Sequence, residues 1–322
     1  MLLSNASQLF LRAKKLQGLH PSSLRDYEVF ISLFQQAVGD IEISSITPEL
    51  IEEYSLSLYE PERNLSRASI GTYLRNLKVF LRFLESDRKT KCEIDPELFN
   101  DTKHPLSSVI RIPKVYRRKV DILTPEEVQS IFEAAYEKGN LVKTRNALII
   151  ALMLDCGLRR EEVTRLTNAR INYRSRKITV LGKGSKERLV PMGNFTLSIL
   201  QEYRNLLARS DKLSEQPHDP LLLTITNQPI TNNTIKLMFC SLRKETELSF
   251  SAHTLRHNFA TNWCIDEYDR CGTIDVFRLQ ILMGHEDIQT TLIYVHMAQE
   301  ILAAQNSVSH LDTIGISLSS CI

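Results

Sequence analysis

Residues able to do acid–base and phosphate chemistry gather near the C-terminal end of the sequence. The stretch 251–296 contains the candidates His253, Arg256, His257, His285, Tyr294 and His296. Histidine can move protons near neutral pH, a guanidinium can bind phosphate with two N–H groups, and a tyrosine hydroxyl can act as a nucleophile. Each residue alone is more often a satisfied, half-buried side chain. Chemistry therefore requires further partners from elsewhere in the chain.

One such partner is expected at a junction between two helices. Residues 144–155 are apolar on most faces, which predicts a central helix that ends at Cys156-Gly157. Arg159 follows, and Glu161 and Glu162 suit the first turn of the next helix. Arg159 and Glu162 could form an ordinary surface pair. Alternatively, Glu162 could orient Arg159 to bind a phosphate.

A second partner is expected at the tip of a hairpin. Two β-prone runs, 178–181 and 188–191, flank the turn Gly182-Lys183-Gly184-Ser185-Lys186. The turn is not a phosphate-binding loop of the GxxxxGK[ST] type. Lys183 and Lys186 could reach into DNA, although most charged turns of this kind are only solvated.

The remaining candidates need helices to hold them. We expect helices over 195–208, capped by Asn194, and over 232–244. Ser251 can cap a helix that carries His253 and Arg256 on one face. A helix over 274–283 is stopped by Gly284, and a final short helix, capped by Asp287, ends near Tyr294.

The first third of the chain has helical spacing of apolar residues, with no strand signal. We expect four or five short helices between residue 6 and about residue 97. In the longest, Arg75, Lys78 and Arg82 share one face, which is either a solvated surface or a surface for DNA phosphates. A Pro-bearing basic stretch with Arg111 and Lys114 follows and is typical of a linker.

Length and composition limit the class of protein. A chain of 322 residues favours two domains, and we expect a helical DNA clamp domain over 1–102, a basic linker over 103–119, and a catalytic domain with its tail over 120–322. The net charge of +2 does not by itself indicate nucleic acid. The six cysteines suit reduced thiols, so we expect a cytoplasmic location. No signal-peptide pattern or membrane-spanning apolar run is present, so no membrane partner is expected.

Five separated motifs together resemble the tyrosine recombinase (phage integrase) family, especially its Xer-like and mobile-element integrases. They are Cys156-Gly-Leu-Arg159 with Glu162, Gly182-Lys183-Gly184, His253-x-x-Arg256, Leu282-Met-Gly-His285, and Tyr294 nine residues after that histidine. The resemblance implies a mainly α fold with a small β-sheet. An N-terminal helical core-binding (SAM-like) domain precedes an α+β catalytic domain.

The resemblance also implies a function, the site-specific cleavage and rejoining of DNA for integration, excision or resolution. Tyr294 forms a 3′-phosphotyrosine bond, Arg159 and Arg256 stabilise the phosphate, and His253 and His285 donate hydrogen bonds or assist proton transfer. Lys183 protonates the 5′-oxygen. No metal, ATP or other cofactor is required. The expected partners are a double-stranded DNA site, three further copies of the chain in a homotetramer that exchanges C-terminal segments (297–311 here), and accessory DNA-binding proteins.

The sequence departs from the family pattern in two places. The connection 266–272 is longer than usual, and Asn168-Ala-Arg170 stands where an acidic residue is common. Two other functions stay open on sequence alone, a type IB topoisomerase-like DNA relaxer and a catalytically silent DNA-binding regulator. The DNA target sequence cannot be deduced, because base readout depends on groove-facing residues.

Overall fold

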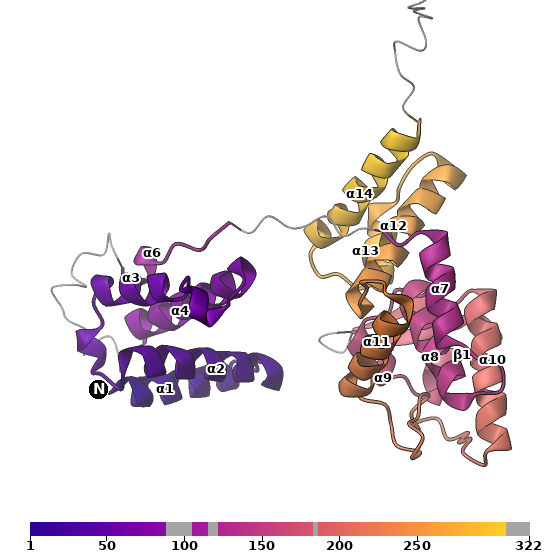
Figure 1. Cartoon of the computed structure of the whole chain (residues 1–322), viewed down its shortest axis with the longest axis horizontal. Helices are drawn as coiled ribbons and strands as arrows, with labels where there is room; N and C mark the ends of the chain where they lie inside the picture. Colours follow the sequence, from indigo (N-terminus) through magenta and orange to yellow (C-terminus); the bar gives the residue numbers. More distant parts are fainter. Residues whose placement is uncertain (88–104, 115–121, 183–185, 307–322) are drawn as a thin grey trace, which may run out of the picture. The chain divides into compact units, whose positions relative to one another are not determined.

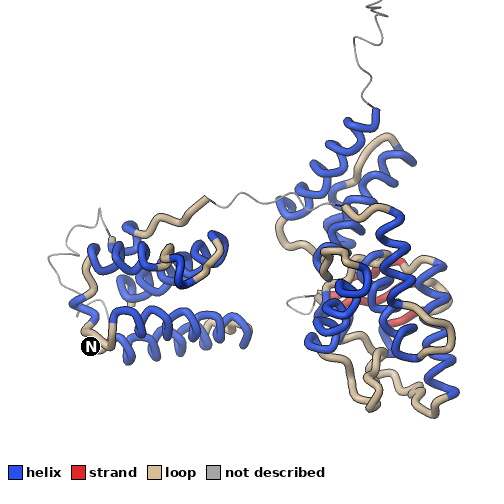
Figure 2. Tube along the Cα trace, in the orientation of Figure 1, coloured by secondary structure: helices blue, strands red, loops and turns tan. Residues whose placement is uncertain are grey.

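A computed structural model describes residues 1–87, 105–114, 122–182 and 186–306. The chain divides into two compact units, Met1–Arg118 and Lys119–Ile322 (Figure 1). Helices dominate both, and the few strands lie in the second unit (Figure 2). The predicted fold class, mainly α with a small sheet, is confirmed. Lys183 and the tail 307–322 lie outside the described residues.

The first unit is built from helices around one apolar core. Its elements are α1 (Leu3–Leu16), α2 (Pro21–Val38), η1 (Ile43–Ser45), α3 (Pro48–Ser57), η2 (Pro61–Arg63), α4 (Arg67–Ser86) and α6 (Leu106–Val109). Thr47 and Ser66 cap α3 and α4, as their positions predict, by accepting hydrogen bonds from backbone N–H groups three residues later. Phe10, Phe34 and Phe80 are fully buried at the centre.

Part of the expected linker packs into this core. Leu106 and Ile110 are buried with the residues of α4, and the Ser107 backbone N–H donates to Glu85 at 2.8 Å. The prediction of a linker was based on the basic residues of this stretch, and it did not consider that Leu106 and Ile110 could be buried. Farther along, Arg111 and Lys114 are exposed.

The second unit combines helices with one small sheet. Its helices are α7 (Pro125–Ala135), α8 (Leu141–Leu154), α9 (Arg160–Thr164), η3 (Asn168–Arg170), α10 (Asn194–Arg209), α11 (Asn232–Thr246), α12 (Ala252–Cys271), α13 (Val276–Met283) and α14 (Ile288–Asn306). Strands β1 (Ile171–Asn172), β2 (Lys177–Leu181) and β3 (Glu187–Pro191) pair antiparallel in the order β1-β2-β3. The predicted hairpin is therefore present, with Val180 opposite Arg188.

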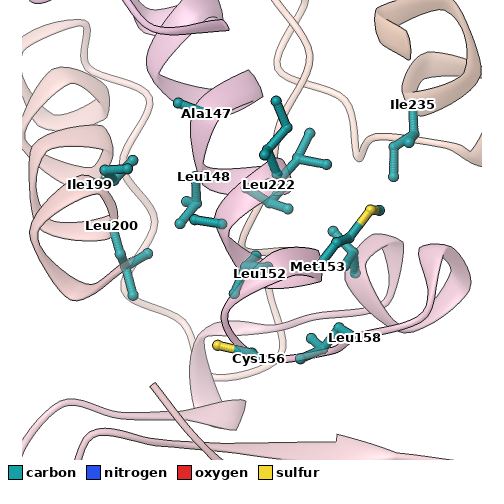
Figure 3. Close-up of a cluster of buried hydrophobic side chains, with 14 of the residues drawn as sticks. Ala147, Leu148, Leu152, Met153, Cys156, Leu158, Ile199, Leu200, Leu222 and Ile235 are labelled. Atoms are coloured by element: carbon teal, nitrogen blue, oxygen red, sulfur yellow. The ribbon is translucent and has the colours of Figure 1, made fainter. Parts of the chain in front are cut away.

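Helix α8 is the centre of this unit, as its apolar sequence predicts. Leu148, Leu152 and Met153 are fully buried, and side chains from α10 and α11 gather around them (Figure 3). A second cluster joins α12, α13 and α14 through residues such as Leu279, Met283 and Tyr294. The candidate nucleophile thus lies in a packed core.

No described helix is long and apolar enough to cross a membrane.

Three local predictions were wrong. The final helix does not end near Tyr294 but continues to Asn306, because apolar residues keep helical spacing beyond the tyrosine. Residues 266–271 are not a loop: they extend α12 by more than a turn, until Gly272 ends it at φ +71°. Gly193, not Asn194, caps α10, and Asp155 accepts from both the Gly193 N–H and the Thr196 hydroxyl.

Candidate active site

Arg159 lies at the start of α9, where two helical segments meet. Its backbone N–H donates to Glu162 Oε2 at 2.7 Å, and its guanidinium donates to Glu162 Oε1 and to the carbonyl of Gly284, each at 3.0 Å. The Arg159 side chain is nevertheless 40% exposed, whereas that of Glu162 is 7% exposed. The pair is therefore not an ordinary surface pair, because Glu162 is buried; its carboxylate holds Arg159 while the guanidinium still faces solvent.

Sequence reasoning missed Arg188, the second partner of Glu162. It extends from β3, is buried, and binds both carboxylate oxygens of Glu162 at 2.8 Å. Its Nε donates to the carbonyl of Leu282 at 2.8 Å. The alternation of the strand could have indicated it. Side chains of a strand point to opposite faces in turn, and in β3 positions 188 and 190 face inward while Leu189 is 56% exposed.

Arg256 extends from α12 into the same cluster and is buried. Its guanidinium donates to the carbonyls of Gly157 and Met283, and its Nη1 lies 4.0 Å from Glu162. Burial, followed by the charge of Arg159, lowers the pKa of Arg256 to about 9, so it stays protonated at neutral pH. Three guanidiniums thus surround one carboxylate, which leaves the cluster positive and suited to an anion.

His285 follows α13 and has a defined hydrogen-bonding state. Its Nε2 lies 3.3 Å from Arg256 Nη2, and its Nδ1 lies 2.9 Å from the hydroxyl of Thr291. A guanidinium cannot accept a hydrogen bond, so Nε2 accepts and Nδ1 carries the proton. Burial, together with the charge of Arg256 and the other arginines, lowers the pKa of His285 to about 4. The histidine is therefore neutral and has a basic nitrogen facing the arginine cluster.

Tyr294 lies in the first half of α14 and is 3% exposed. Its ring stacks on His285 with centroids 5.9 Å apart and lies 4.9 Å from the ring of His257. Burial raises the pKa of the Tyr294 hydroxyl, while the charges of Arg256 and Arg159 lower it. The phenol is neutral at pH 7 and would need to lose its proton before acting as a nucleophile.

His253 is exposed on the first turn of α12, one turn before buried His257. The helix begins where the sequence predicts, because Ser251 accepts a hydrogen bond from the Thr254 N–H at 3.2 Å. His253 and Arg256 are three residues apart on α12, so they are neighbours on one face of the helix, as predicted. Burial of part of the ring, and then the charge of Arg256, lower the pKa of His253. The remaining histidine of the stretch, His296, is exposed.

The structure thus brings Arg159, Glu162, Arg256, His285 and Tyr294 together from four separate elements. Lys183 lies outside the described residues, between the ends of β2 and β3. Lys186, the residue before β3, is exposed. In the first unit, Arg75 and Arg82 are exposed on α4 and Lys78 is partly buried between them.

Gly284 provides a first test of this geometry. It ends α13 at φ +61°, and a Cβ added there would lie 3.0 Å from Arg188 Nη1 and 3.2 Å from Arg188 Cδ. We expect Gly284→Ala to lower the free energy of unfolding by about 2–3 kcal/mol, since it combines backbone strain with a clash against a buried ion pair. Urea denaturation of the full chain measures this change.

Gly272 supplies the matched control. Its φ is +71°, but a Cβ there meets nothing within 4 Å. Gly272→Ala should therefore cost only the backbone term, about 1 kcal/mol. Equal losses for the two variants would mean that the contact with Arg188 is not important.

Comparisons with known proteins show which family the chain resembles. The model of the phage integrase family matches residues 121–300. The tyrosine recombinase XerC of Chlamydia trachomatis serovar L2 is 30% identical over 264 residues, which cover 81% of this chain and 76% of the relative. The tyrosine recombinase XerD of Pseudomonas putida is 29% identical over 275 residues, covering 81% and 86%.

Two solved structures share the fold. The Tn1549 transposon integrase in complex with transposon right end DNA has a TM-score of 0.67 at 18% identity and covers 96% of this chain and 100% of that one. A lambda integrase dimer bound to a COC' core site has a TM-score of 0.67 at 17% identity, covering 92% and 95%. Together with the matched family model and the similarity to XerC, these findings show that the chain belongs to the phage integrase family and is a tyrosine recombinase of the Xer-like type.

Proposed function

We propose that this recombinase cleaves and rejoins DNA at a specific site with Tyr294 as its nucleophile. The Tyr294 oxygen attacks the scissile phosphorus, a 3′-phosphotyrosine bond forms, and the bond to the 5′-oxygen breaks. Attack by a free 5′-hydroxyl reverses these changes and joins the strand to a new partner without ATP. The observation that carries the proposal is the buried phenol of Tyr294, which stacks on His285 and whose pKa is raised by burial but lowered by the charges of Arg256 and Arg159.

The arginines would stabilise the phosphate as its negative charge increases. Arg256 is fixed by the carbonyls of Gly157 and Met283, so it needs little reorganisation during the reaction. Arg159 is partly exposed and is held by Glu162, which leaves it able to bind the second non-bridging oxygen.

Two residues transfer protons in this proposal, and a third donates a hydrogen bond to the phosphate. His285 is proposed to accept the phenolic proton, since its Nε2 carries no proton and would exchange its contact with Arg256 for one with the phenol. His253 would bind a phosphate oxygen from the exposed side. Lys183 is proposed as the acid that protonates the 5′-oxygen.

The first unit, its basic segment and Lys186 of the second unit would hold the DNA. Arg75, Lys78 and Arg82 of α4, with Arg111, Lys114 and Lys186, are proposed phosphate contacts. Replacing Arg75 and Arg82 with Gln should weaken binding similarly for specific and unrelated DNA and reduce the slope of log K against log salt by about 2. Gln at exposed Arg12 and Arg25, which lie on other helices of the unit, gives the control. An unchanged slope for the α4 variant would contradict the clamp.

Tyr294→Phe tests the nucleophile directly. A nicked recombination site traps the cleaved state, so the wild-type chain should accumulate a covalent protein–DNA adduct that survives denaturing electrophoresis. We expect the variant to form none, because phenylalanine keeps the ring packing but lacks the attacking oxygen.

Tyr268→Phe is the matched control, since Tyr268 is on α12 and is 41% exposed. It should form adduct as the wild type does. An adduct with Tyr294→Phe would remove Tyr294 as the nucleophile.

A recombination assay with one or two DNA sites tests the proposed assembly. We propose a homotetramer on two DNA sites, in the cytoplasm, serving a mobile element and aided by accessory DNA-binding proteins. Recombinant products that require two sites would support the tetramer, and products from one site alone would contradict it. Neither the relaxer nor the silent regulator is favoured, because the similar proteins are named as recombinases and integrases. Relaxation of plasmids that lack the site would favour the former.

A further inference from the structure

A second histidine lies directly behind His253, and the proposed reaction gives it no role. His257 is one helical turn farther along α12 and is 9% exposed. The Nε2 atoms of the two residues are 2.6 Å apart, and the rings meet edge-on with centroids at 4.0 Å. The other face of His257 lies against Tyr294. One buried imidazole therefore contacts both an exposed catalytic candidate and the nucleophile.

A hydrogen bond between two Nε2 atoms requires that one of them carry a proton and the other not. Burial, followed by the charges of His253 and Arg256, lowers the pKa of His257 to about 4, so this residue is neutral at pH 7. The groups that face the pair are Arg256 on the same helix, Tyr294 on α14 and His285, which follows α13. Two arrangements of the proton are then possible.

The surroundings of His257 distinguish the two arrangements. Its Nδ1 is buried and has no hydrogen-bond partner among the described residues. If His253 donated, His257 would have to carry its own proton on Nδ1, which would be a buried N–H with no acceptor. Such orphaned donors are rare in folded proteins. If His257 donates, its Nδ1 carries no proton and the orphaned donor is avoided.

We propose that His257 is a positioning residue that donates from Nε2 to His253 Nε2 and so fixes the Nδ1–H tautomer of His253. The ring of His253 is then held in one orientation, with its only N–H at Nδ1 available for a phosphate oxygen. This inference rests on the proposed function of His253 at the phosphate. The packing of His257 on Tyr294 further couples the position of His253 to that of the nucleophile.

The tautomer can be measured without DNA. Two-bond ¹⁵N–¹H correlation spectra of histidine-labelled full chain identify the protonated nitrogen of each ring, and the spectra of His253→Gln and His257→Phe assign the signals. We expect the His253 proton on Nδ1 and the His257 proton on Nε2. In His257→Phe, His253 should lose this preference. A wild-type His253 protonated on Nε2, or an unchanged tautomer in the variant, overturns the proposal.

Single-turnover cleavage of the nicked site measures the consequence. His257→Phe keeps an aromatic ring against Tyr294 but removes the donor, and we expect about 10-fold to 100-fold slower cleavage. In His257→Gln the side-chain amide reaches the position of Nε2 and can donate, so it should restore most of the rate. Exposed His218 supplies the control His218→Phe, expected at the wild-type rate. Equal rates for the Phe and Gln variants would mean that packing, not the hydrogen bond, is what matters.

Failure of this inference is distinguishable from failure of the proposed function. If the wild-type chain forms no Tyr294 adduct, the proposed function fails, while the spectra still decide the tautomer. If the adduct forms and the spectra show His253 protonated on Nε2, only the role of His257 is lost.

Discussion

Arg256→Lys is expected to slow cleavage about 1000-fold while leaving DNA affinity within about twofold. The guanidinium of Arg256 donates to two carbonyls and to His285 at once. A lysine keeps the charge, but a single ammonium cannot reach these acceptors and a phosphate together. The loss should therefore appear in the chemical step. Single-turnover cleavage of a nicked site gives the rate, and titration of the same DNA gives the affinity.

The same substitution at Arg243 gives the control. Arg243 is an exposed residue of α11 that donates to the carbonyl of Phe250 at 3.5 Å. Arg243→Lys should cleave at the wild-type rate. If Arg256→Lys instead weakened DNA binding as much as cleavage, Arg256 would be a binding residue and not a stabiliser of the transition state.

The sequence predicted those parts of the site that depend on local signals. Ser251 caps α12 and places Arg256 one turn inside it, and Gly284 ends α13 just before His285. Both features follow from backbone preferences within a few residues. The spacing of the motifs then identified the family. Side-chain types and local caps were sufficient to name Arg159, Glu162 and Tyr294 as candidates.

The parts that depend on tertiary contacts were not predictable in this way. Arg188 belongs to the site because β3 lies against α9 and α13, and no local pattern states which carboxylate a buried arginine will meet. His257 is one of several candidates in the stretch 251–296, and nothing in the sequence shows that its ring contacts both His253 and Tyr294. Each case requires knowledge of distances between elements that are far apart in sequence.

Arg188→Met is expected to lower the free energy of unfolding by about 3–5 kcal/mol, the largest stability loss that we predict. Arg188 binds both oxygens of Glu162, and both side chains are 7% exposed. Methionine fills a similar volume but leaves the carboxylate buried without this partner. Urea denaturation of the full chain at pH 7 measures the loss. Since Glu162 also orients Arg159, cleavage should fall as well.

A double variant tests whether the unpaired charge is the cause. Glu162→Gln removes the charge but keeps an oxygen that can accept from the Arg159 backbone N–H, so adding it to Arg188→Met should recover part of the lost stability. A double variant no more stable than Arg188→Met would contradict this explanation.

The pH dependence gives an independent test of the same cause. Burial raises the pKa of Glu162, but the hydrogen bonds and charge of Arg188, with those of Arg159, outweigh it and hold the value at about 2. The wild-type stabilisation is therefore complete above the unfolded pKa of about 4.3 and is lost as pH falls towards 2. In Arg188→Met the effect of burial is less opposed, so Glu162 should bind a proton at a higher pH, which relieves the buried charge. The stability gap between wild type and variant should thus narrow as pH falls from 7 to about 4. A constant gap would mean that Arg188 stabilises the fold through packing alone.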